Sequence, residues 1–400
     1  MKIRASIGQT GTEKDVKLFD YLSGYTWNNG NAVLDGELVT GLNQRGLPIT
    51  NLSWTKNTTS NIGFDLTMFN NRLKITADAF RKDITGVPAA RYDVLLPSEV
   101  GYTLPNENLN KQAYIGAEGM VTWTDHIGDL NYTVSGNFTF SRYKSIETYK
   151  PRFNNSWDEY RNSAEGRWGG IYWGYQVIGQ FQSEEEIRNY PVNLDGNNNR
   201  TLLPGDFIYK DVNGDGIING MDERPIGYPE GWAPIMSFGG NIGLAWKGID
   251  LNIDLSGGAM QGWRQNYELA NAYHGNGNSP VYLLEDRWHR ADLYDPESEW
   301  IPGRYPAIRK GEFSYNNKNS DFWLHNVRYL RIKNLEVGYS LPAQLLRPIR
   351  AQKVRIYANV SNLCSFDNVG KFGVDPEITA AAAVVYPQQR TFLLGFNITY

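Results

Sequence analysis

Alternation of apolar and polar residues, repeated along much of the chain, constrains the fold more than any other feature of this sequence. It is clearest over residues 236–257, where Lys247-Gly248 separates two alternating segments. The apolar positions there are Met236, Phe238, Ile242, Leu244, Trp246, Ile249, Leu251, Ile253 and Leu255. Because successive side chains of a β-strand point to opposite faces, this pattern predicts a hairpin with one apolar and one polar face.

The same period recurs elsewhere, and we predict ten β-strands. They cover residues 1–8, 61–69, 73–81, 115–124, 130–142, 235–246, 249–257, 327–341, 354–362 and 391–400. The phase of the alternation changes near Lys333-Asn334, which predicts a β-bulge or a turn, since an uncorrected slip would move every later side chain to the wrong face. The last strand ends on Tyr400 and resembles the closing aromatic strand of bacterial outer-membrane proteins.

The links between these strands alternate in length. The short links are 70–72, 125–129, 247–248 and 342–353, and the long links are 9–60, 82–114, 143–234, 258–326 and 363–390. Short periplasmic turns that alternate with long extracellular loops are typical of outer-membrane barrels. The pattern therefore predicts an all-β fold, an antiparallel transmembrane β-barrel of which about ten strands are present.

Composition agrees with a barrel and argues against a helical membrane protein. The longest apolar run, 380–386, is far shorter than the roughly 18 residues that a spanning helix needs. Aromatic residues make up 13% of the chain, 41 residues are glycine and the mean hydropathy is -0.49, which suits strands joined by long polar loops. We interpret Trp123, Tyr143, Trp246 and Tyr400 as interfacial girdle residues, with ordinary sheet aromatics as the alternative.

The same residues argue against several other functions. The net charge is -4, and the scattered cations form no basic stripe, so we expect no nucleic-acid partner. Cys364 is the only cysteine, and the four histidines have no metal or catalytic spacing. The carboxylates of Glu184, Glu185 and Asp286 fall in predicted loops without a nucleophile motif. We therefore predict that the chain is not an enzyme.

Residues 211–222 fit the twelve-residue calcium-loop template with one departure. The predicted metal ligands are Asp211, Asn213, Asp215, the backbone carbonyl of Ile217, Asn219 and Asp222. The departure is Asp222, because the template prefers a longer Glu there, and this predicts weaker binding of a structural Ca²⁺. The alternative is an ion-free loop of Asx turns. Upstream, Ser183 to Glu186 predicts a capping box that opens a short helix.

Several stretches resemble the SusC/RagA family of TonB-dependent outer-membrane transporters found in Bacteroidota. They include MKIRASIGQTG from Met1, GYQVIGQFQSEEEIRNYP from Gly174, PGDFIYKDVNGDGIINGMDERPIG from Pro204, YLRIKNLEVGYSLP from Tyr329 and RTFLLGFNITY from Arg390. The resemblance covers essentially the whole chain. It implies a 22-stranded barrel filled by an N-terminal plug. It also implies that residues 1–400 are the C-terminal part of that barrel, without the signal peptide, the plug and the first half of the barrel.

The family implies import of glycans or peptides across the outer membrane of a Gram-negative bacterium. The implied partners are outer-membrane lipid, a SusD-like lipoprotein that captures the oligosaccharide or peptide, and TonB, which acts through the missing N-terminal region. Candidate substrate contacts in the long loops are Trp168, Tyr172, Trp173 and Tyr273, because aromatic faces stack on sugar rings. The alternative is a soluble secreted calcium-stabilised β-protein that binds carbohydrate, which leaves the alternating link lengths unexplained.

Overall fold

The computed structural model describes residues 1–400 except 14–18, 20, 45–46, 50, 52, 92, 98, 100, 102–103, 232, 310–312 and 378–387. The described residues divide into two units. Unit 1 contains 1–67, 75–119 and 140–169, and unit 2 contains 68–74, 120–139 and 170–400. We describe each unit by itself. None of the helices in the described residues is long and apolar enough to cross a membrane.

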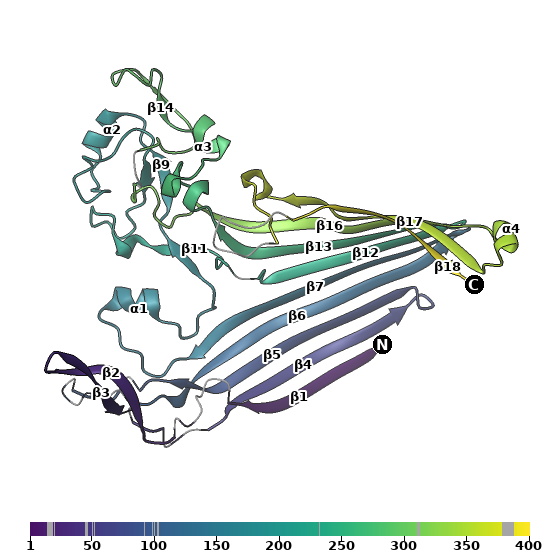
Figure 1. Cartoon of the computed structure of the whole chain (residues 1–400), viewed down its shortest axis with the longest axis horizontal. Helices are drawn as coiled ribbons and strands as arrows, with labels where there is room; N and C mark the ends of the chain where they lie inside the picture. The colour runs from purple at the N-terminus through teal and green to yellow at the C-terminus, as the bar shows by residue number, and fades with distance from the viewer. Residues whose placement is uncertain are drawn as a thin grey trace. The chain divides into compact units, whose positions relative to one another are not determined.

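Within the described residues, ten strands form one antiparallel sheet (Figure 1). They are β1 (Lys2–Thr12), β4 (Thr55–Met68), β5 (Leu73–Ala89), β6 (Glu107–Ile127), β7 (Leu130–Glu147), β12 (Met236–Trp246), β13 (Ile249–Arg264), β16 (Leu324–Ser340), β17 (Lys353–Asp367) and β18 (Thr391–Thr399). Each strand lies beside the ones before and after it in this order. All ten predicted strands are confirmed, and β1 and β18 are the sheet edges.

Several strands are longer than the alternation predicted, and the additions lie beside the long links. β5 continues to Ala89, β6 begins at Glu107 and β13 continues to Arg264. A strand that extends beyond an apolar layer no longer needs an apolar face, although its backbone ladder can continue. The hydropathy pattern therefore marks only part of these three strands.

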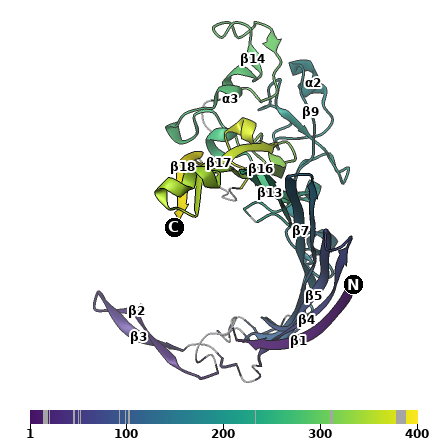
Figure 2. The same cartoon turned by 90° about the vertical axis from the view of Figure 1, so that its right-hand side faces the viewer.

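Unit 1 combines the first strands with two structured links. β1 pairs with β4 so that Ile3 lies opposite Phe64 on the apolar face. Figure 2 shows a separate hairpin of β2 (Tyr25–Leu34) and β3 (Glu37–Gln44), which falls in the link 9–60 and is not among the ten predicted strands. Its turn is Asp35-Gly36, with φ of 54° and 81°, a sequence that suits a tight hairpin turn. Asn155 caps the short helix α1 (Ser156–Asn162).

In unit 2, strand register aligns the apolar residues of neighbouring strands. One row runs from Leu244 through Leu251, Val337, Ala358 and Leu394, each opposite the next. Leu394 and Phe396 in β18 are 80% and 70% exposed, so no described residue covers these two side chains. The aligned rows form an apolar belt, a name we use for the apolar face of β12, β13, β16, β17 and β18.

The predicted irregularity at Lys333-Asn334 is confirmed as a bulge. Asp254 pairs with Asn334, whereas the next residue, Leu255, pairs with Ile332. The register against β17 shifts at the same place. Lys333 is thus skipped by both ladders, and its Nζ bonds to Glu377 Oε2 at 2.7 Å. The bulge keeps the apolar residues on both sides of it in one belt.

The long links of unit 2 fold into a structure of their own, which we call the loop core. Its elements are β8 (Tyr172–Gly174), β9 (Val177–Gln180), α2 (Glu184–Asn189), β10 (Phe207–Tyr209), η2 (Gly220–Asp222), β11 (Arg224–Gly227), η3 (Tyr267–Leu269), η4 (His274–Asn276), α3 (Val281–Glu285), β14 (His289–Arg290) and β15 (Trp300–Ile301). Phe181, Phe207, Tyr209 and Trp323 are buried at its centre. This is a conventional hydrophobic core, and it lies outside the ten-stranded sheet.

The remaining links of unit 2 carry short helical turns. α4 (Ala343–Leu346) and η5 (Arg347–Ile349) lie between β16 and β17. η6 (Gly370–Phe372) follows β17, where Phe372, Val369 and Val374 pack with Trp263 and Val327. Part of this last link, 378–387, lies outside the described residues.

Candidate functional site

The face of the unit 2 sheet opposite the apolar belt is a network of polar side chains. Asn241 Nδ2 donates to Asp254 Oδ1 at 2.6 Å, and Asn359 Nδ2 donates to Asn334 Oδ1 at 2.7 Å. Arg355 in β17 bridges two strands, donating to Asp250 Oδ1 at 3.0 Å and to Glu336 Oε1 at 2.7 Å. Charges and amides of this kind are costly in hydrocarbon, so this face suits a wet lumen and the apolar belt suits lipid.

Unit 1 repeats this arrangement. Arg4 Nε and Nη2 lie 3.0 Å from Asp65 Oδ2 and 2.7 Å from Asp78 Oδ2, on the face opposite Ile3. Arg4 therefore ties β1 to β4, its neighbour in the sheet, and to β5, the next strand along, in addition to the backbone ladder between β1 and β4. In each unit, charged side chains on this face pair across strands, although the residues that form the pairs differ.

A hollow of about 940 Å³ opens on the polar face of unit 1, beside the long links. It is lined by Thr12, Thr55, Asn57, Thr59, Phe80, Lys82, Ile84, Val87, Pro88, Asn106, Gln112, Tyr114 and Ser141. Its volume lies within the range of ligand sites. Sequence reasoning missed it, but Phe80 and Tyr114 occupy polar-face positions of β5 and β6, and that exception to the alternation was an available signal.

Tyr143, which we interpreted as a girdle residue, also belongs to this polar face. Its ring packs edge-on against Tyr114 with centroids 5.6 Å apart. By contrast Trp246 and Tyr400 are exposed at the ends of β12 and the chain. The girdle interpretation therefore stays a prediction for Trp246 and Tyr400. For Tyr143 it is replaced by a position on the polar face, in contact with Tyr114.

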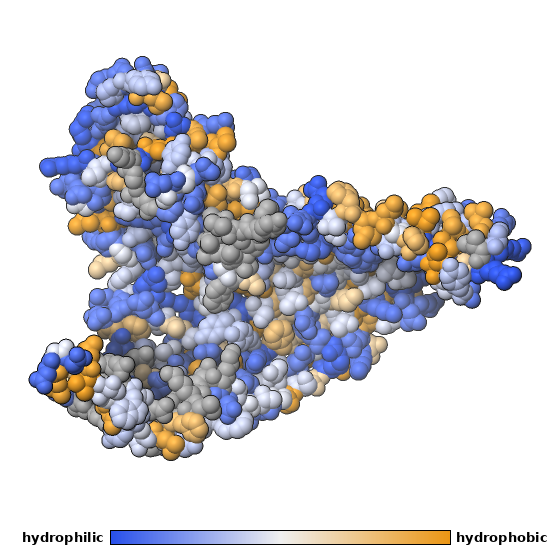
Figure 3. Space-filling view, in the orientation of Figure 1, coloured by the Kyte–Doolittle hydropathy of each residue, from blue (hydrophilic) through white to orange (hydrophobic). Residues whose placement is uncertain are grey.

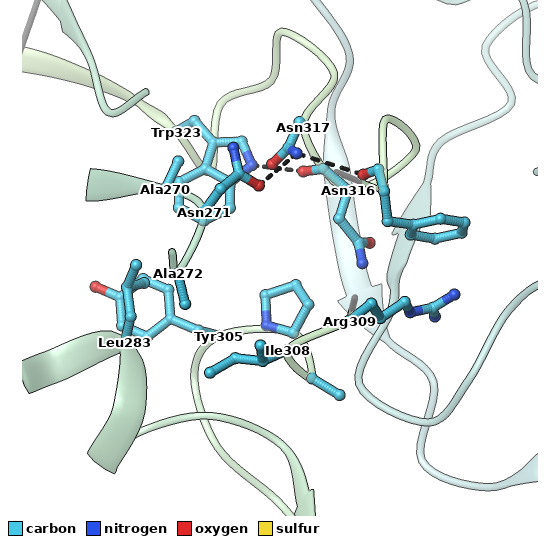
Figure 4. Close-up of a pocket in the computed structure, with 13 residues that line it drawn as sticks. Ala270, Asn271, Ala272, Leu283, Tyr305, Ile308, Arg309, Asn316, Asn317 and Trp323 are labelled. Atoms are coloured by element: carbon cyan, nitrogen blue, oxygen red, sulfur yellow. Dashed lines mark hydrogen bonds between the residues drawn. The ribbon is translucent and has the colours of Figure 1, made fainter. Parts of the chain in front are cut away.

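The loop core contains a much smaller cavity, of about 60 Å³, shown in Figure 4. Trp323, Tyr305, Asn316 and Arg309 are among the residues around it. A cavity of this size holds a few water molecules at most and cannot admit a sugar ring or a peptide. We therefore assign it to packing rather than to binding.

A buried polar cluster closes the loop core. Asn316 Nδ2 donates to Asp206 Oδ1 at 2.8 Å, and Arg309 forms an ion pair with the same carboxylate. Trp323 Nε1 donates to the carbonyl oxygen of Asn316 at 2.6 Å. Burial raises the pKa of Asp206, while Arg309 and Asn316 oppose that rise. Because these partners come from distant parts of the chain, the cluster ties the two long links together.

A cage of tyrosines in the loop core is filled by the chain itself. The Lys318 ammonium lies 5.1 Å from the ring centroids of both Tyr175 and Tyr315, and 5.3 Å from that of Tyr209. Burial lowers the pKa of Lys318. Tyrosine faces stabilise a cation by their quadrupoles. The cage therefore stabilises the fold and leaves no room for an external cation.

The four predicted substrate aromatics fall in different settings. Tyr172 and Trp173 are neighbours in β8, both half-buried, and adjacent strand residues point to opposite faces. The Tyr172 hydroxyl donates to Glu230 Oε2 at 3.4 Å, and burial raises the pKa of Tyr172 to about 12. Tyr273 is exposed. Trp168 belongs to unit 1, where Lys144 Nζ lies 5.4 Å from its ring centroid. Their contact with substrate stays a prediction.

The predicted calcium loop is ordered by hydrogen bonds to its own backbone. Asp211 accepts from the amides of Gly214 and Gly216 at 2.7 and 2.9 Å. Asp222 is buried and accepts from Val212 and Asn219, both at 2.9 Å. Among the described residues, no three His, Cys, Asp or Glu side chains form a group that could hold a metal ion. These contacts are the Asx-turn arrangement, and calcium binding stays a prediction.

The predicted cap of α2 is present with one change of partner. Ser183 accepts from the Glu186 amide, as in a capping box. The Glu186 carboxylate accepts from the amide of Gln182, at 2.6 Å, rather than from that of Ser183. The helix begins where the sequence predicted, and its reciprocal bond is displaced by one residue.

A sheet with a lipid-compatible face, a polar face and long structured links on alternate connections is the architecture of part of a membrane β-barrel. The comparisons with known proteins agree with this class. No family model matches the sequence. The chain is 25% identical over its whole length to TonB-dependent receptor P3 of Formosa agariphila and covers 39% of it. It is 25% identical to TonB-dependent receptor SusC of Bacteroides thetaiotaomicron, again over its whole length, and covers 37% of it.

Solved structures show the same fold. All of the chain aligns with 40% of a chain in the RagAB peptide importer in its open-open state, with a TM-score of 0.67 and 20% identity. The RagAB peptide transporter gives a TM-score of 0.65 at 19% identity. The resemblance to SusC and RagA is thus confirmed over the whole chain. The chain spans about two fifths of the length of the curated relatives it matches.

Proposed function

We propose that the chain forms the C-terminal part of a TonB-dependent importer in the outer membrane of a Gram-negative bacterium. The observation that carries this proposal is the exposed apolar belt of unit 2, backed by the polar network on the opposite face. Leu394 and Phe396 would be solvated by lipid, and Arg355 and its carboxylates by water. The similarity to transporters over the whole chain supports the same assignment.

The two alternatives account for less. A soluble secreted β-protein would expose the whole apolar belt to water, and the comparisons do not support it. The similar proteins are receptors and importers rather than enzymes, in agreement with the prediction that the chain does not catalyse a reaction.

We further propose that the complete protein takes up an oligosaccharide or a peptide and works with a SusD-like lipoprotein outside and with TonB inside. The resemblance to SusC and to the RagAB peptide importer supports this partnership. The hollow of unit 1 is a candidate contact surface for substrate, because hydroxyls, amides and two aromatic rings line a space large enough for a few residues or sugars.

Uptake by cells that express the complete protein tests the proposal. Cells are expected to accumulate a labelled oligosaccharide or peptide, and to lose this uptake when the gene or tonB is deleted. Substitution of Tyr114 by Ala in the hollow is expected to weaken uptake, whereas Tyr294→Ala, at a fully exposed position of unit 2, serves as the control. Uptake that persists without TonB would contradict the proposal.

A further inference from the structure

The link between β16 and β17 carries an excess of positive charge. Arg347, Arg350 and Lys353 are all exposed there, and the sequence holds no Asp or Glu from Val337 to Phe366. Within the described residues none of the three forms an ion pair. We call these three side chains, together with α4 and η5, the basic turn.

The other short links of unit 2 differ in this respect. Arg72 lies 3.1 Å from Asp125, and Lys247 lies 3.4 Å from Asp129, so the cations of those links meet a carboxylate of the neighbouring link. At the basic turn, Lys353 interacts electrostatically with Asp250, but none of the three cations forms an ion pair within the described residues. Cations without an ion pair, gathered at one place, favour an anionic partner from outside the chain.

The basic turn lies at the end of the apolar belt. α4 contacts β17, where Leu346 and Val354 are both buried. Val354 opposes Ile398 on the apolar face, and the next residues of that face, Ile356 and Phe396, are exposed. Leu345 of α4 is 60% exposed. Figure 3 shows hydrophobic residues gathered beside hydrophilic ones at the α4 end. The turn thus presents apolar and cationic groups side by side.

We propose that the basic turn binds the phosphate headgroups of anionic phospholipids in the periplasmic leaflet. The inference rests on the proposed function, which places the short links at that side of the membrane. Guanidinium groups bind phosphate oxygens through paired hydrogen bonds. Arg347 and Arg350 supply two guanidinium groups. Leu345 and the apolar belt contact the acyl chains of the same lipid, which selects a lipid over free phosphate.

Vesicle flotation of the 400-residue chain, refolded in detergent, tests this. Wild-type protein is expected to partition more strongly into phosphatidylcholine vesicles that contain phosphatidylglycerol than into phosphatidylcholine alone. The variant R347Q/R350Q/K353Q is expected to lose that preference by about fivefold for each charge. The matched control R188Q/R200Q/K210Q removes three exposed cations of the loop core and is expected to keep it. R347K/R350K keeps the charge but loses the paired hydrogen bonds of the guanidinium groups, and is expected to retain only part of the preference.

The outcomes separate the inference from the proposed function. Equal partition of the wild type into both vesicles, or equal loss in the two triple variants, would overturn the lipid site and leave the barrel proposal standing. Abolition of the preference by inorganic phosphate as well as by lipid would show a free-phosphate site and also overturn it. Failure of the wild type to enter either vesicle would overturn both. Normal entry of R347Q/R350Q/K353Q into neutral vesicles shows that the variant has folded.

Discussion

Two regions of unit 2 use the same kinds of side chain in opposite ways. In the loop core, Phe207 and Trp323 are 0% and 1% exposed, packed among other rings. In the sheet, Leu394 and Phe396 are among the most exposed hydrophobic residues. The loop core is stabilised as a water-soluble domain is, by burying apolar surface inside protein. The apolar side chains of the sheet are not buried by protein, so they are removed from water only if the surrounding solvent is apolar.

Polar groups show the same contrast between the two regions. Asp206, Asn316 and Arg309 are enclosed by the loop core and satisfy one another. Asn241, Asp254 and Arg355 instead lie on an open face of the sheet, where each is partly exposed. The comparison indicates that the loop core keeps its fold by internal packing. The strands need an apolar solvent around the apolar belt. If this is right, a substitution in one region should change the stability of that region and leave the other region intact.

The largest effect is expected for Trp323→Ala in the loop core. It removes the buried ring and its hydrogen bond to Asn316, which costs about 3–5 kcal/mol for a large aromatic side chain. Protease cleavage within 170–227 and 258–323 is expected to rise, while heat-modifiable migration of the strands on gels is unchanged. Tyr294→Ala, at an exposed position, is the control. Simultaneous loss of both readouts would show that the regions are not separately stabilised.

Leu394→Arg tests the sheet. An arginine that faces lipid near the middle of a barrel strand costs about 2–4 kcal/mol. Insertion into the membrane, measured by fractionation and heat-modifiable migration, is expected to fall, with the protease resistance of the loop core retained. Leu393→Arg, at the neighbouring position on the opposite face and paired with Asn359, is expected to be tolerated. Equal damage from both variants would refute the assignment of the faces.

Asp195→Asn is expected to destabilise the segment 195–201 of the loop core. Asp195 accepts from the amides of Asn197 and Asn199 and from Thr201. Although burial opposes it, these hydrogen bonds lower the pKa of Asp195, so its stabilisation is present above the usual Asp pKa and is lost as pH falls.

Hydrogen bonds to a charged group contribute about 1.5–3 kcal/mol, and protease resistance measured against pH is the test. The variant is expected to be less resistant at neutral pH and less sensitive to acid than the wild type. Glu185→Gln, at an exposed position, is the control. A pH profile unchanged by Asp195→Asn would contradict the prediction.

Calcium is expected to have the smallest effect. At ten times its Kd the ion would add about 1.4 kcal/mol to the stability of the 211–222 loop. Cleavage of that loop is expected to slow with Ca²⁺ and not with Mg²⁺. Asp215→Asn removes an exposed predicted ligand while Asp222 keeps its buried role, and is expected to abolish the response. If Ca²⁺ has no effect, the Asx turns alone account for the loop.

What the sequence by itself determined is the set of strands, their order of short and long links, the bulge at Lys333 and the two faces of each strand. These follow from a two-residue period, which is a local property that needs no knowledge of distant residues. The same reasoning found the cap of α2, because a cap is set by neighbouring residues.

Only the tertiary structure decided the loop core and the functional surfaces. Phe181, Phe207 and Trp323 meet although long stretches of chain separate them, and no period in the sequence predicts such a meeting. The hollow of unit 1 likewise needs neighbouring strands before Phe80 and Tyr114 share a surface. The basic turn suits an anionic lipid only because the fold places its cations at the end of the apolar belt. Contacts of this kind depend on how strands are paired, and pairing is a property of the folded chain rather than of any segment.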